Sequence, residues 1–230
     1  MDPDRIVTFP WGVDVDHFSP QADSPSSIIR ERLGWGEDAF VLLSTRSWAP
    51  LYGVEDLARA FVRVAPDIPE MRLLMLGNGP LAPEIHRIFM DAKMLDQVHF
   101  PGQVSRDDLP AYYRAADLYI STSHSDGTSI SLLEALACAT PVLLSDIPGN
   151  REWVSSSPNG RGARGDGDVG WLFLDGDVDS LSEGIVHAWE SRSQLPAMGQ
   201  AARRMAESRA DWDQNFPRLF EAYQIALNRR

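Results

Sequence analysis

The chain has 230 residues, of which 43% are hydrophobic and 23% are charged, an ordinary balance for one globular domain with its own core. Its net charge of −12 argues against a nucleic-acid-binding protein, which needs basic groups to neutralise phosphates. No apolar run approaches the ~20 residues of a membrane-spanning helix, and the acidic start MDPDRIVTFP does not resemble a signal peptide. We therefore expect a cytoplasmic protein without a transmembrane segment.

Six short runs are continuously apolar, which predicts strands buried on both faces of a parallel sheet. One further strand candidate, IVTF (6–9), lies within a lead-in segment, 1–26, that is rich in turn residues. The six runs are AFVLLST (39–45), MRLLMLG (71–77), VHF (98–100), DLYIST (117–122), PVLLSD (141–146) and GWLF (170–173).

Amphipathic segments separate these runs, with apolar residues repeating at helical spacing from Val54 to Phe61, from Leu181 to Trp189 and in a closing helix at 211–228. The alternation predicts an α/β fold: a Rossmann-like, doubly wound, mainly parallel six-stranded sheet with helices on both faces, forming one domain over 1–230. Ligands bind beyond the carboxyl ends of such strands. The loops of interest are therefore 45–53, 77–81, 101–106, 122–129 and 146–150.

The stretch SDGTSISLLEALACATPVLLSD (125–146) places two acids in or beside an apolar helix. A buried carboxylate is costly unless it is hydrogen bonded or paired. Glu134 therefore either accepts hydrogen bonds from ligand hydroxyls or makes an internal ion pair or backbone contact, and spacing does not decide between these. Asp126, before Gly-Thr-Ser, is either a helix N-cap or a ligand contact.

A helix that began at Asp126 would place the two carboxylates ~12 Å apart along its axis and within ~80° around it. Between them, the N–H groups of Gly127, Thr128 and Ser129 would offer a positive dipole end that suits a phosphate. An elongated ligand with the order sugar, diphosphate and ribose fits this pattern.

Two further residues near strand ends are candidates for ligand contact. Arg46 follows the run 39–45, where it could pair with a phosphate or with any of the 33 acidic residues. His124 lies beside Asp126. The histidines and hydroxyl residues show no Ser-His-Asp order and no metal-ligand spacing, and the DGD of the Gly-rich loop 155–170 lacks the ligands of an EF-hand, so we expect no metal site.

Taken in order, these segments resemble the C-terminal half of a family 4 glycosyltransferase, a retaining enzyme of GT-B architecture. PWGVDVDHFSP (10–20) resembles the segment that enters the second domain, and TRSWAPLYGVEDLARAF (45–61) resembles the Arg-loop-Lys-Gly-helix segment. STSHSDGTSISLLEALACATPVLLSDIPGNREWV (121–154) resembles the signature block, in which two glutamates stand eight residues apart. LLMLGNGP, VHFPGQV and GWLFLDGDVDSL are similar to the other family blocks.

The resemblance implies roles for single residues toward a nucleotide-diphosphate-sugar donor. Glu134 would hold the ribose hydroxyls, Asp126 would touch the sugar hydroxyls, and Arg46 would bind the diphosphate, which makes these three the expected catalytic residues. The remaining expected donor contacts are the main chain of Val104 at the base, the amides of Gly127, Thr128 and Ser129 at the phosphates and sugar, and Ile130 on the ribose side.

Two residues depart from the family pattern. Tyr52 stands where the family has a lysine before the loop glycine, and a phenol cannot neutralise a diphosphate. Another cation could do so, the affinity for the donor could be lower, or Tyr52 could donate a neutral hydrogen bond. Asp126 stands where the family has a glutamate, and a side chain shorter by one methylene could change which sugar fits.

The resemblance also implies that the acceptor-binding N-terminal domain of the GT-B fold is absent from this chain. We expect the chain alone to be inactive or nearly so, with any peripheral membrane association arising through the missing domain. No cofactor and no essential metal are expected beyond the donor itself. Two alternatives remain: a non-catalytic binding or assembly module that kept the fold, or another GT-B enzyme such as a sugar epimerase or phosphorylase.

Overall fold

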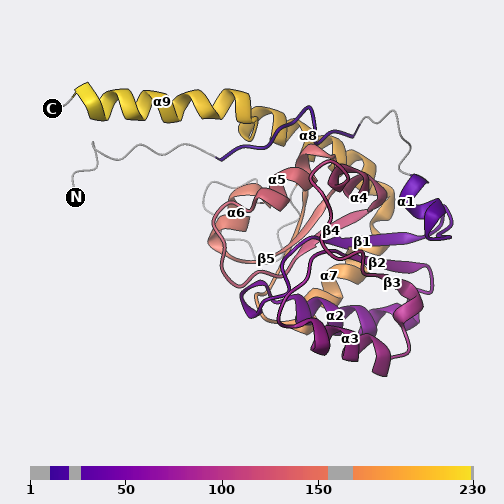
Figure 1. Cartoon of the computed structure of the whole chain (residues 1–230). Coiled ribbons are helices and arrows are strands. Elements are labelled where there is room, and N and C mark those ends of the chain that lie inside the picture. Colours follow the sequence, from indigo (N-terminus) through magenta and orange to yellow (C-terminus); the bar gives the residue numbers. More distant parts are fainter. Residues whose placement is uncertain (1–10, 21–26, 155–167, 229–230) are drawn as a thin grey trace.

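The structure, a computed structural model, describes residues 11–20, 27–154 and 168–228 (Figure 1). The candidate strand at 6–9 and most of the Gly-rich loop at 155–170 lie outside these residues. The described part forms one sheet with helices on both of its faces, as the sequence predicts.

All six expected strands form, and all of them pair in parallel in the order β3-β2-β1-β4-β5-β6. Each lies within the apolar run that predicts it, so the doubly wound sheet is confirmed. The strands are β1 (Phe40–Ser44), β2 (Met71–Met75), β3 (Val98–His99), β4 (Leu118–Ser121), β5 (Val142–Ser145) and β6 (Gly170–Phe173).

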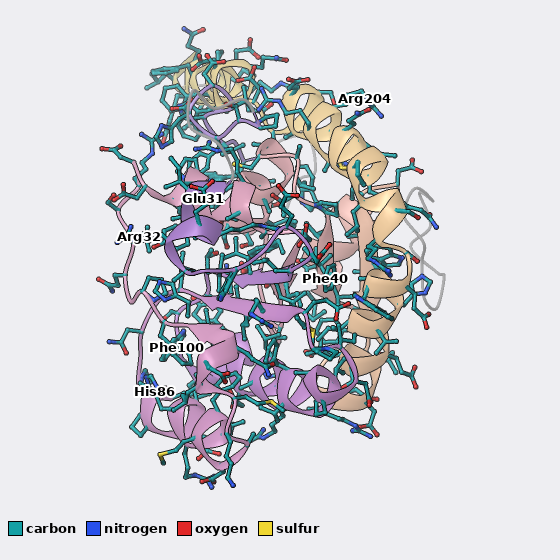
Figure 2. The ribbon with its side chains drawn as sticks, turned by 90° about the vertical axis from the view of Figure 1, so that its right-hand side faces the viewer. Glu31, Arg32, Phe40, His86, Phe100 and Arg204 are labelled. Carbon is teal, nitrogen blue, oxygen red and sulfur yellow. The ribbon has the colours of Figure 1, made fainter. Side chains whose placement is uncertain are left out.

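The helices divide between the two faces of the sheet: α2, α3 and α7 cover one face, while α1, α4, α5 and α8 lie on the other (Figure 1). In the side view, charged side chains such as Glu31, Arg32 and Arg204 point away from these layers (Figure 2). The helices are α1 (Ser27–Arg32), α2 (Val54–Val64), α3 (Ala82–Asp91), α4 (Leu109–Ala115), α5 (Ile130–Ala137), α6 (Pro148–Val154), α7 (Val178–Glu190), α8 (Leu195–Arg209) and α9 (Trp212–Asn228).

Every residue of β1 is buried, which explains why its sequence is continuously apolar. Val41 and Leu43 pack among the helices of one face, while Phe40 and Leu42 pack among those of the other. Full burial of such a side chain stabilises the fold by ~1.5–3 kcal/mol. Cys138 is also buried, and its burial raises the pKa of the thiol to about 12.

The closing helix α9 begins one residue after the expected position 211, and its contacts with the rest of the described chain are concentrated at its start. There, the ring of Trp212 meets Trp11 edge-on at 5.8 Å and stacks on Phe216 at 4.9 Å. The rest of α9 extends past the body of the domain (Figure 1). The predicted apolar face is therefore largely uncovered, with Tyr223 62% exposed and Leu227 65% exposed. Within the described ranges, no helix has the length and apolar character to cross a bilayer.

Candidate functional site

The loops after β1 and β4 lie together at the carboxyl edge of the sheet. The strand order reverses between β1 and β4, and ligands of open α/β sheets bind at such a switch point. The Thr122 hydroxyl, after β4, donates to the carbonyl of Tyr52, in the loop after β1, at 2.8 Å. This hydrogen bond holds together two of the loops that the sequence marked for ligand binding.

Arg46 extends across this edge to the segment that enters α5. Its Nη2 pairs with Asp126 at 2.5 Å, and its Nη1 donates to the hydroxyls of Ser129 at 2.6 Å and Ser131 at 3.0 Å. Only 11% of the Arg46 side chain is exposed. Its Nε is buried and has no hydrogen-bond acceptor among the described residues. Arg46 thus pairs with an acid, as one interpretation expected, but that acid is another candidate site residue.

Tyr52 makes a contact that differs from all three consequences expected from its replacement of the family lysine. The guanidinium carbon of Arg46 lies 4.3 Å from the centre of the Tyr52 ring. A cation over an aromatic face is attracted by the quadrupole of the ring. Tyr52 therefore contacts the neighbouring cation, and its ring covers one face of the guanidinium group.

Asp126 is not the N-cap of α5. The helix begins at Ile130 with Ser129 at the N-cap position, where the Ser129 side chain makes no capping hydrogen bond. The expectation that a single helix carries both acids is therefore wrong, because the stretch 126–129 is loop. Arg46 explains the difference, since its guanidinium holds the Asp126 carboxylate. An ion pair with good geometry at a site only 22% exposed replaces the cap.

The backbone of this loop leaves hydrogen-bond donors available. The amides of Gly127, Thr128 and Ser129 donate to no described residue. Thr128 is half-buried and Gly127 is exposed. Three free N–H groups just before a helix form a surface with positive potential, which favours an anion.

Glu134 lies one turn into α5, is not sealed in the core and pairs with no cation among the described residues. Its Oε2 accepts a hydrogen bond of 2.8 Å from the hydroxyl of Tyr113, and its Oε1 accepts none from the described residues. Burial raises the pKa of Glu134, while the Tyr113 hydrogen bond and the charges of Arg106 and His17 act in the opposite direction. The carboxylate is thus partly desolvated, with one oxygen occupied and one available.

Two cavities meet at Glu134. The first, of about 330 Å³, includes Val104, and the structure therefore brings these two predicted residues together. Its other polar walls come from the ends of β1, β2 and β3. The full lining is Thr45, Ser47, Leu76, Gly77, Asn78, Gln103, Val104, Leu109, Ser131 and Glu134.

The second cavity, of about 570 Å³, lies on the other side of Glu134. Ile130 is 50% exposed and lines it. Arg106 contributes a charge, and Trp11 and Trp212 contribute apolar walls. The start of α9 and the segment 11–18 therefore complete the surroundings of Glu134, which the closing position of α9 in the sequence did not indicate.

His124 is at the same edge but points to a different partner. Its Nδ1 lies 2.8 Å from a carboxylate oxygen of Asp175, which follows β6. No hydrogen bond joins it to Asp126 among the described residues. No group of three or more metal-ligating side chains is assembled in the described part of the chain.

Several site residues were missed by the sequence analysis. Ser131, Asn78 and Gln103 could have been found, because each is polar and follows a strand end or lies one turn before Glu134. The signal was present in the loops 77–81 and 101–106, which were marked as segments without single residues being chosen. Tyr113 carried no such signal, since it lies inside α4.

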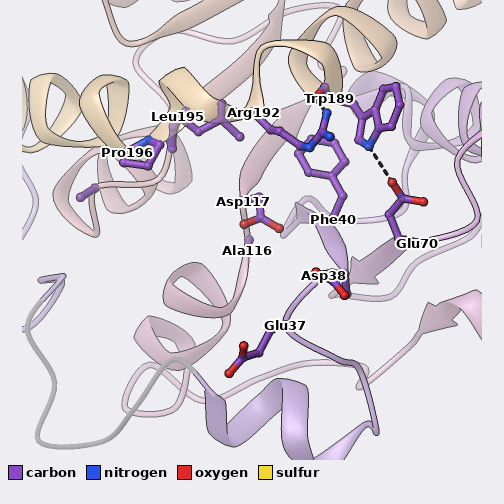
Figure 3. A pocket seen from close by; sticks show the side chains of 13 residues that line it. Glu37, Asp38, Phe40, Glu70, Ala116, Asp117, Trp189, Arg192, Leu195 and Pro196 are labelled. Atoms are coloured by element: carbon purple, nitrogen blue, oxygen red, sulfur yellow. Dashed lines mark hydrogen bonds between the residues drawn. The ribbon is translucent and has the colours of Figure 1, made fainter.

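A third cavity, of about 440 Å³, lies at the opposite edge of the sheet and contains none of the predicted site residues (Figure 3). Glu70 accepts a hydrogen bond from the indole of Trp189 at 3.0 Å. Asp117 accepts hydrogen bonds from Arg30 and the Val41 amide. Glu70 and Asp117 already have partners within the fold, and the cavity contains none of the predicted site residues, so the carboxyl edge remains the candidate site.

Comparison with known proteins identifies the family of this chain. Residues 26–205 match the model of the family described as "Glycosyl transferases group 1". The chain belongs to this family. A D-inositol 3-phosphate glycosyltransferase of Kineococcus radiotolerans is 31% identical over 238 residues, which include 100% of this chain and 54% of that protein. The glycosyltransferase chain described here therefore spans about half the length of that relative.

Two further proteins extend the comparison. A GDP-mannose-dependent alpha-(1-6)-phosphatidylinositol monomannoside mannosyltransferase of Mycolicibacterium smegmatis is 28% identical, over 92% of this chain and 54% of that protein. The crystal structure of Anabaena HepE in complex with UDP and glucose superposes with a TM-score of 0.74 and 22% identity. It covers 94% of this chain and 54% of HepE, which supports the GT-B type of fold.

Proposed function

We propose that this chain is the nucleotide-sugar-binding half of a retaining, family 4-type hexosyltransferase. The observation that supports this most is the arrangement at one sheet edge. Arg46 pairs with Asp126 and donates to Ser131, which lines the cavity of about 330 Å³ together with Glu134, and the three free amides of 127–129 follow Asp126 in the chain. A positive centre flanked by two acids suits a ligand whose anionic middle separates two groups of hydroxyls.

In this proposal Glu134 accepts hydrogen bonds from the ribose hydroxyls through its available oxygen. Arg46 binds the diphosphate, and its buried Nε is a further donor without an acceptor in the described chain. Asp126 binds hydroxyls of the transferred sugar. Because Arg46 and Asp126 pair with each other, the diphosphate must share or replace this contact.

The remaining expected residues surround the donor that Glu134, Arg46 and Asp126 bind in this proposal. The main chain of Val104 contacts the base, and the loop amides of 127–129 bind the phosphates. Ile130, half-exposed at the start of α5, lies on the ribose side. Tyr52 acts through its ring contact with Arg46, while His124, held by Asp175, is at the periphery.

Transfer breaks the bond between the sugar and the diphosphate, and negative charge develops on the leaving group. Arg46 and the loop amides are the groups that can stabilise this charge. Removing one such donor typically raises the barrier by ~3 kcal/mol. The proposal assigns this task to side chains and amides, and it includes neither a cofactor nor a metal.

The acceptor site belongs, in this proposal, to a second domain outside this chain. The chain spans about half of the relatives it matches, and we propose that it is inactive alone. One relative is named for GDP-mannose, and HepE is described with UDP and glucose. A donor test should therefore include both bases, and the acceptor stays open.

Calorimetry with UDP-glucose and GDP-mannose tests donor binding by this chain. We expect one of them to bind and Glu134→Ala to weaken its binding by ~10-fold or more, because hydrogen bonds to a charged acceptor are lost. Glu221→Ala, an exposed acid on α9, is the matched control and should leave the affinity unchanged. Equal affinity in Glu134→Ala would contradict the role of this residue.

A second candidate function is a non-catalytic binding or assembly module. It is favoured by Tyr52, which leaves the diphosphate with one cation fewer than the family pattern provides. If the folded chain bound no nucleotide sugar, this candidate would replace the transferase. An epimerase or phosphorylase is distinguished by product analysis after the chain is joined to a matching N-terminal domain.

A further inference from the structure

Glu134 has a partner that lies behind it in the core. Tyr113, in α4, is completely buried, and its hydroxyl donates to Glu134 Oε2 at 2.8 Å. The same hydroxyl lies 3.2 Å from the Thr45 hydroxyl and 3.1 Å from the Ser131 carbonyl. Three segments of the site, the end of β1, α4 and α5, therefore meet at one phenol.

The chemistry of these groups fixes the direction of the hydrogen bonds. An ionised carboxylate only accepts, and a phenol has a single proton to give. Hydrogen bonds to a charged acceptor are the stronger ones, so the Tyr113 proton goes to Glu134 and the Thr45 hydroxyl donates to the Tyr113 oxygen. Burial, followed by the negative charge of Glu134, raises the pKa of Tyr113 well above its ordinary value, so this hydroxyl keeps its proton.

The ring and the hydroxyl of Tyr113 have separate tasks. The ring packs edge-on against Phe18 at 6.1 Å and beside Tyr119 at 5.9 Å, within the core cluster between the sheet and α5. The hydroxyl makes only polar contacts, and one of these reaches a residue that lines both cavities of the candidate site. A change that removes only the hydroxyl therefore separates positioning from packing.

We infer that Tyr113 is a positioning residue of the donor site, whose hydroxyl holds one oxygen of Glu134 so that the other stays available for ribose hydroxyls. This inference rests on the proposed function, because it assumes that Glu134 receives the ribose. A carboxylate that is held before the ligand arrives loses less rotamer freedom on binding. Tyr113 thereby sets how strongly the site distinguishes ribose from a sugar without hydroxyls.

The test compares UDP and GDP with their 2′,3′-dideoxy counterparts by calorimetry in three proteins: the unaltered chain, Tyr113→Phe and Tyr112→Phe. Tyr112 is the matched control, because it is a buried tyrosine of the same helix with no hydrogen bond to Glu134 in the structure. We expect the unaltered chain to prefer the ribonucleotide by ~10-fold or more. Tyr113→Phe should lose most of this preference, and Tyr112→Phe should keep it.

The ratio of the two affinities is the decisive reading. A purely structural effect of Tyr113→Phe would weaken both nucleotides equally, and an unchanged ratio would overturn the inference while leaving the function of Glu134 intact. No ribose preference in the unaltered chain would overturn both the role of Glu134 and the inference. If Tyr113→Phe does not fold, Thr45→Val decides. Losing the Thr45 donor should lower the ratio of ribonucleotide to dideoxynucleotide affinity ~3-fold. An unchanged ratio in this variant would contradict the inference.

Discussion

At the scale of single residues, the ion pair between Arg46 and Asp126 ties together two groups that the proposed function assigns to different parts of the donor. The pair is largely buried, and Tyr52 covers the guanidinium group. A ligand that brings a diphosphate must therefore compete with a carboxylate that is already in place. The competition makes Asp126 a determinant of affinity for the phosphates as well as for the sugar.

Asp126→Asn should separate these two effects. Removing the negative charge frees Arg46, so the affinity for UDP or GDP should rise by ~3- to 10-fold. The additional affinity that the attached sugar provides should shrink, because the amide replaces one hydroxyl acceptor by a donor. Calorimetry with each nucleoside diphosphate and its sugar derivative measures both quantities.

The matched control for this change is Asp179→Asn, which removes an exposed carboxylate paired with Arg63 at the start of α7. It should alter neither affinity. A parallel loss of affinity for the free and the sugar-bearing nucleotide in Asp126→Asn would show that the carboxylate does not compete for Arg46.

Glu134 predicts a dependence of donor binding on pH. The carboxylate accepts hydrogen bonds from ribose hydroxyls more strongly when it is ionised, and burial raises its pKa above the ordinary value. Protonation therefore occurs at a higher pH than for an exposed glutamate, and nucleotide binding should fall as the pH falls through this raised pKa. Titrations between pH 4 and 8, about the range in which a perturbed glutamate ionises, should show a single loss that is absent in Glu134→Gln.

The charged and titratable groups around Glu134 must be considered when that profile is read. They come from α4, from the loop before it, from the N-terminal segment, from α5 itself and from the start of α9: Tyr113, Arg106, His17, Asp14, Cys138, Asp211 and Asp213. A profile that persists in Glu134→Gln would show that Glu134 is not the group whose protonation weakens nucleotide binding.

At the scale of the elements, the loop after β1 depends on Gly53. Its φ of +53° lies in the left-handed region, and a Cβ atom there would stand 2.4 Å from the carbonyl oxygen of Thr122. Gly53→Ala should therefore destabilise the fold by about 1 to 3 kcal/mol. Thermal unfolding measures this, with Gly36→Ala as the control, because a Cβ at Gly36 meets nothing within 4 Å.

An unchanged melting temperature in Gly53→Ala would mean that the loop adjusts without cost. A loss of stability together with loss of nucleotide binding would instead support the close approach of the two loops. This approach is the reason that Arg46 and the segment before α5 share one edge.

The sequence predicted the elements better than it predicted the contacts between them. Continuous apolar runs identified all six strands, because burial on both faces leaves a clear pattern. The start of α5 was misplaced, since Asp126 has the sequence signature of an N-cap and the competing partner, Arg46, is 80 residues away. Local sequence patterns do not reveal which distant cation forms an ion pair with an acidic residue.

The same limit applies to the candidate site. Arg46 was predicted because it follows a strand and Glu134 because it breaks an apolar pattern, whereas Val104 was implied only by the family resemblance. Tyr113 was missed, because a buried aromatic residue in a helix looks like ordinary core until its hydroxyl is located. Its contact with Glu134 depends on how α4 packs beside α5, which no spacing within either helix encodes.

At the scale of the whole molecule, α9 is the element that the rest of the described chain covers least. Beyond Phe216 its larger apolar residues are mostly exposed, Phe220 at 55% and Tyr223 at 62%. An apolar surface of this kind usually marks an interaction site.

A chain that ends at Pro217 should therefore fold as well as the full chain. The removed part buries little surface against the described residues, so we expect the melting temperature to change by less than about 2 °C. The aromatic contacts of Trp212 with Trp11 and Phe216 are retained. A large drop in the melting temperature would show that the second half of α9 stabilises this domain itself.

The wall of the larger cavity gives the molecule a built-in optical probe. Trp11 is 45% exposed and borders the same space as Glu134. Indole emission shifts in colour and brightness when surrounding water is displaced, so a nucleotide seated against Glu134 would be visible in a fluorimeter without any dye. Trp11→Phe should weaken that signal, Trp212 borders the same cavity and should retain part of it, and the other five tryptophans would supply a steady background.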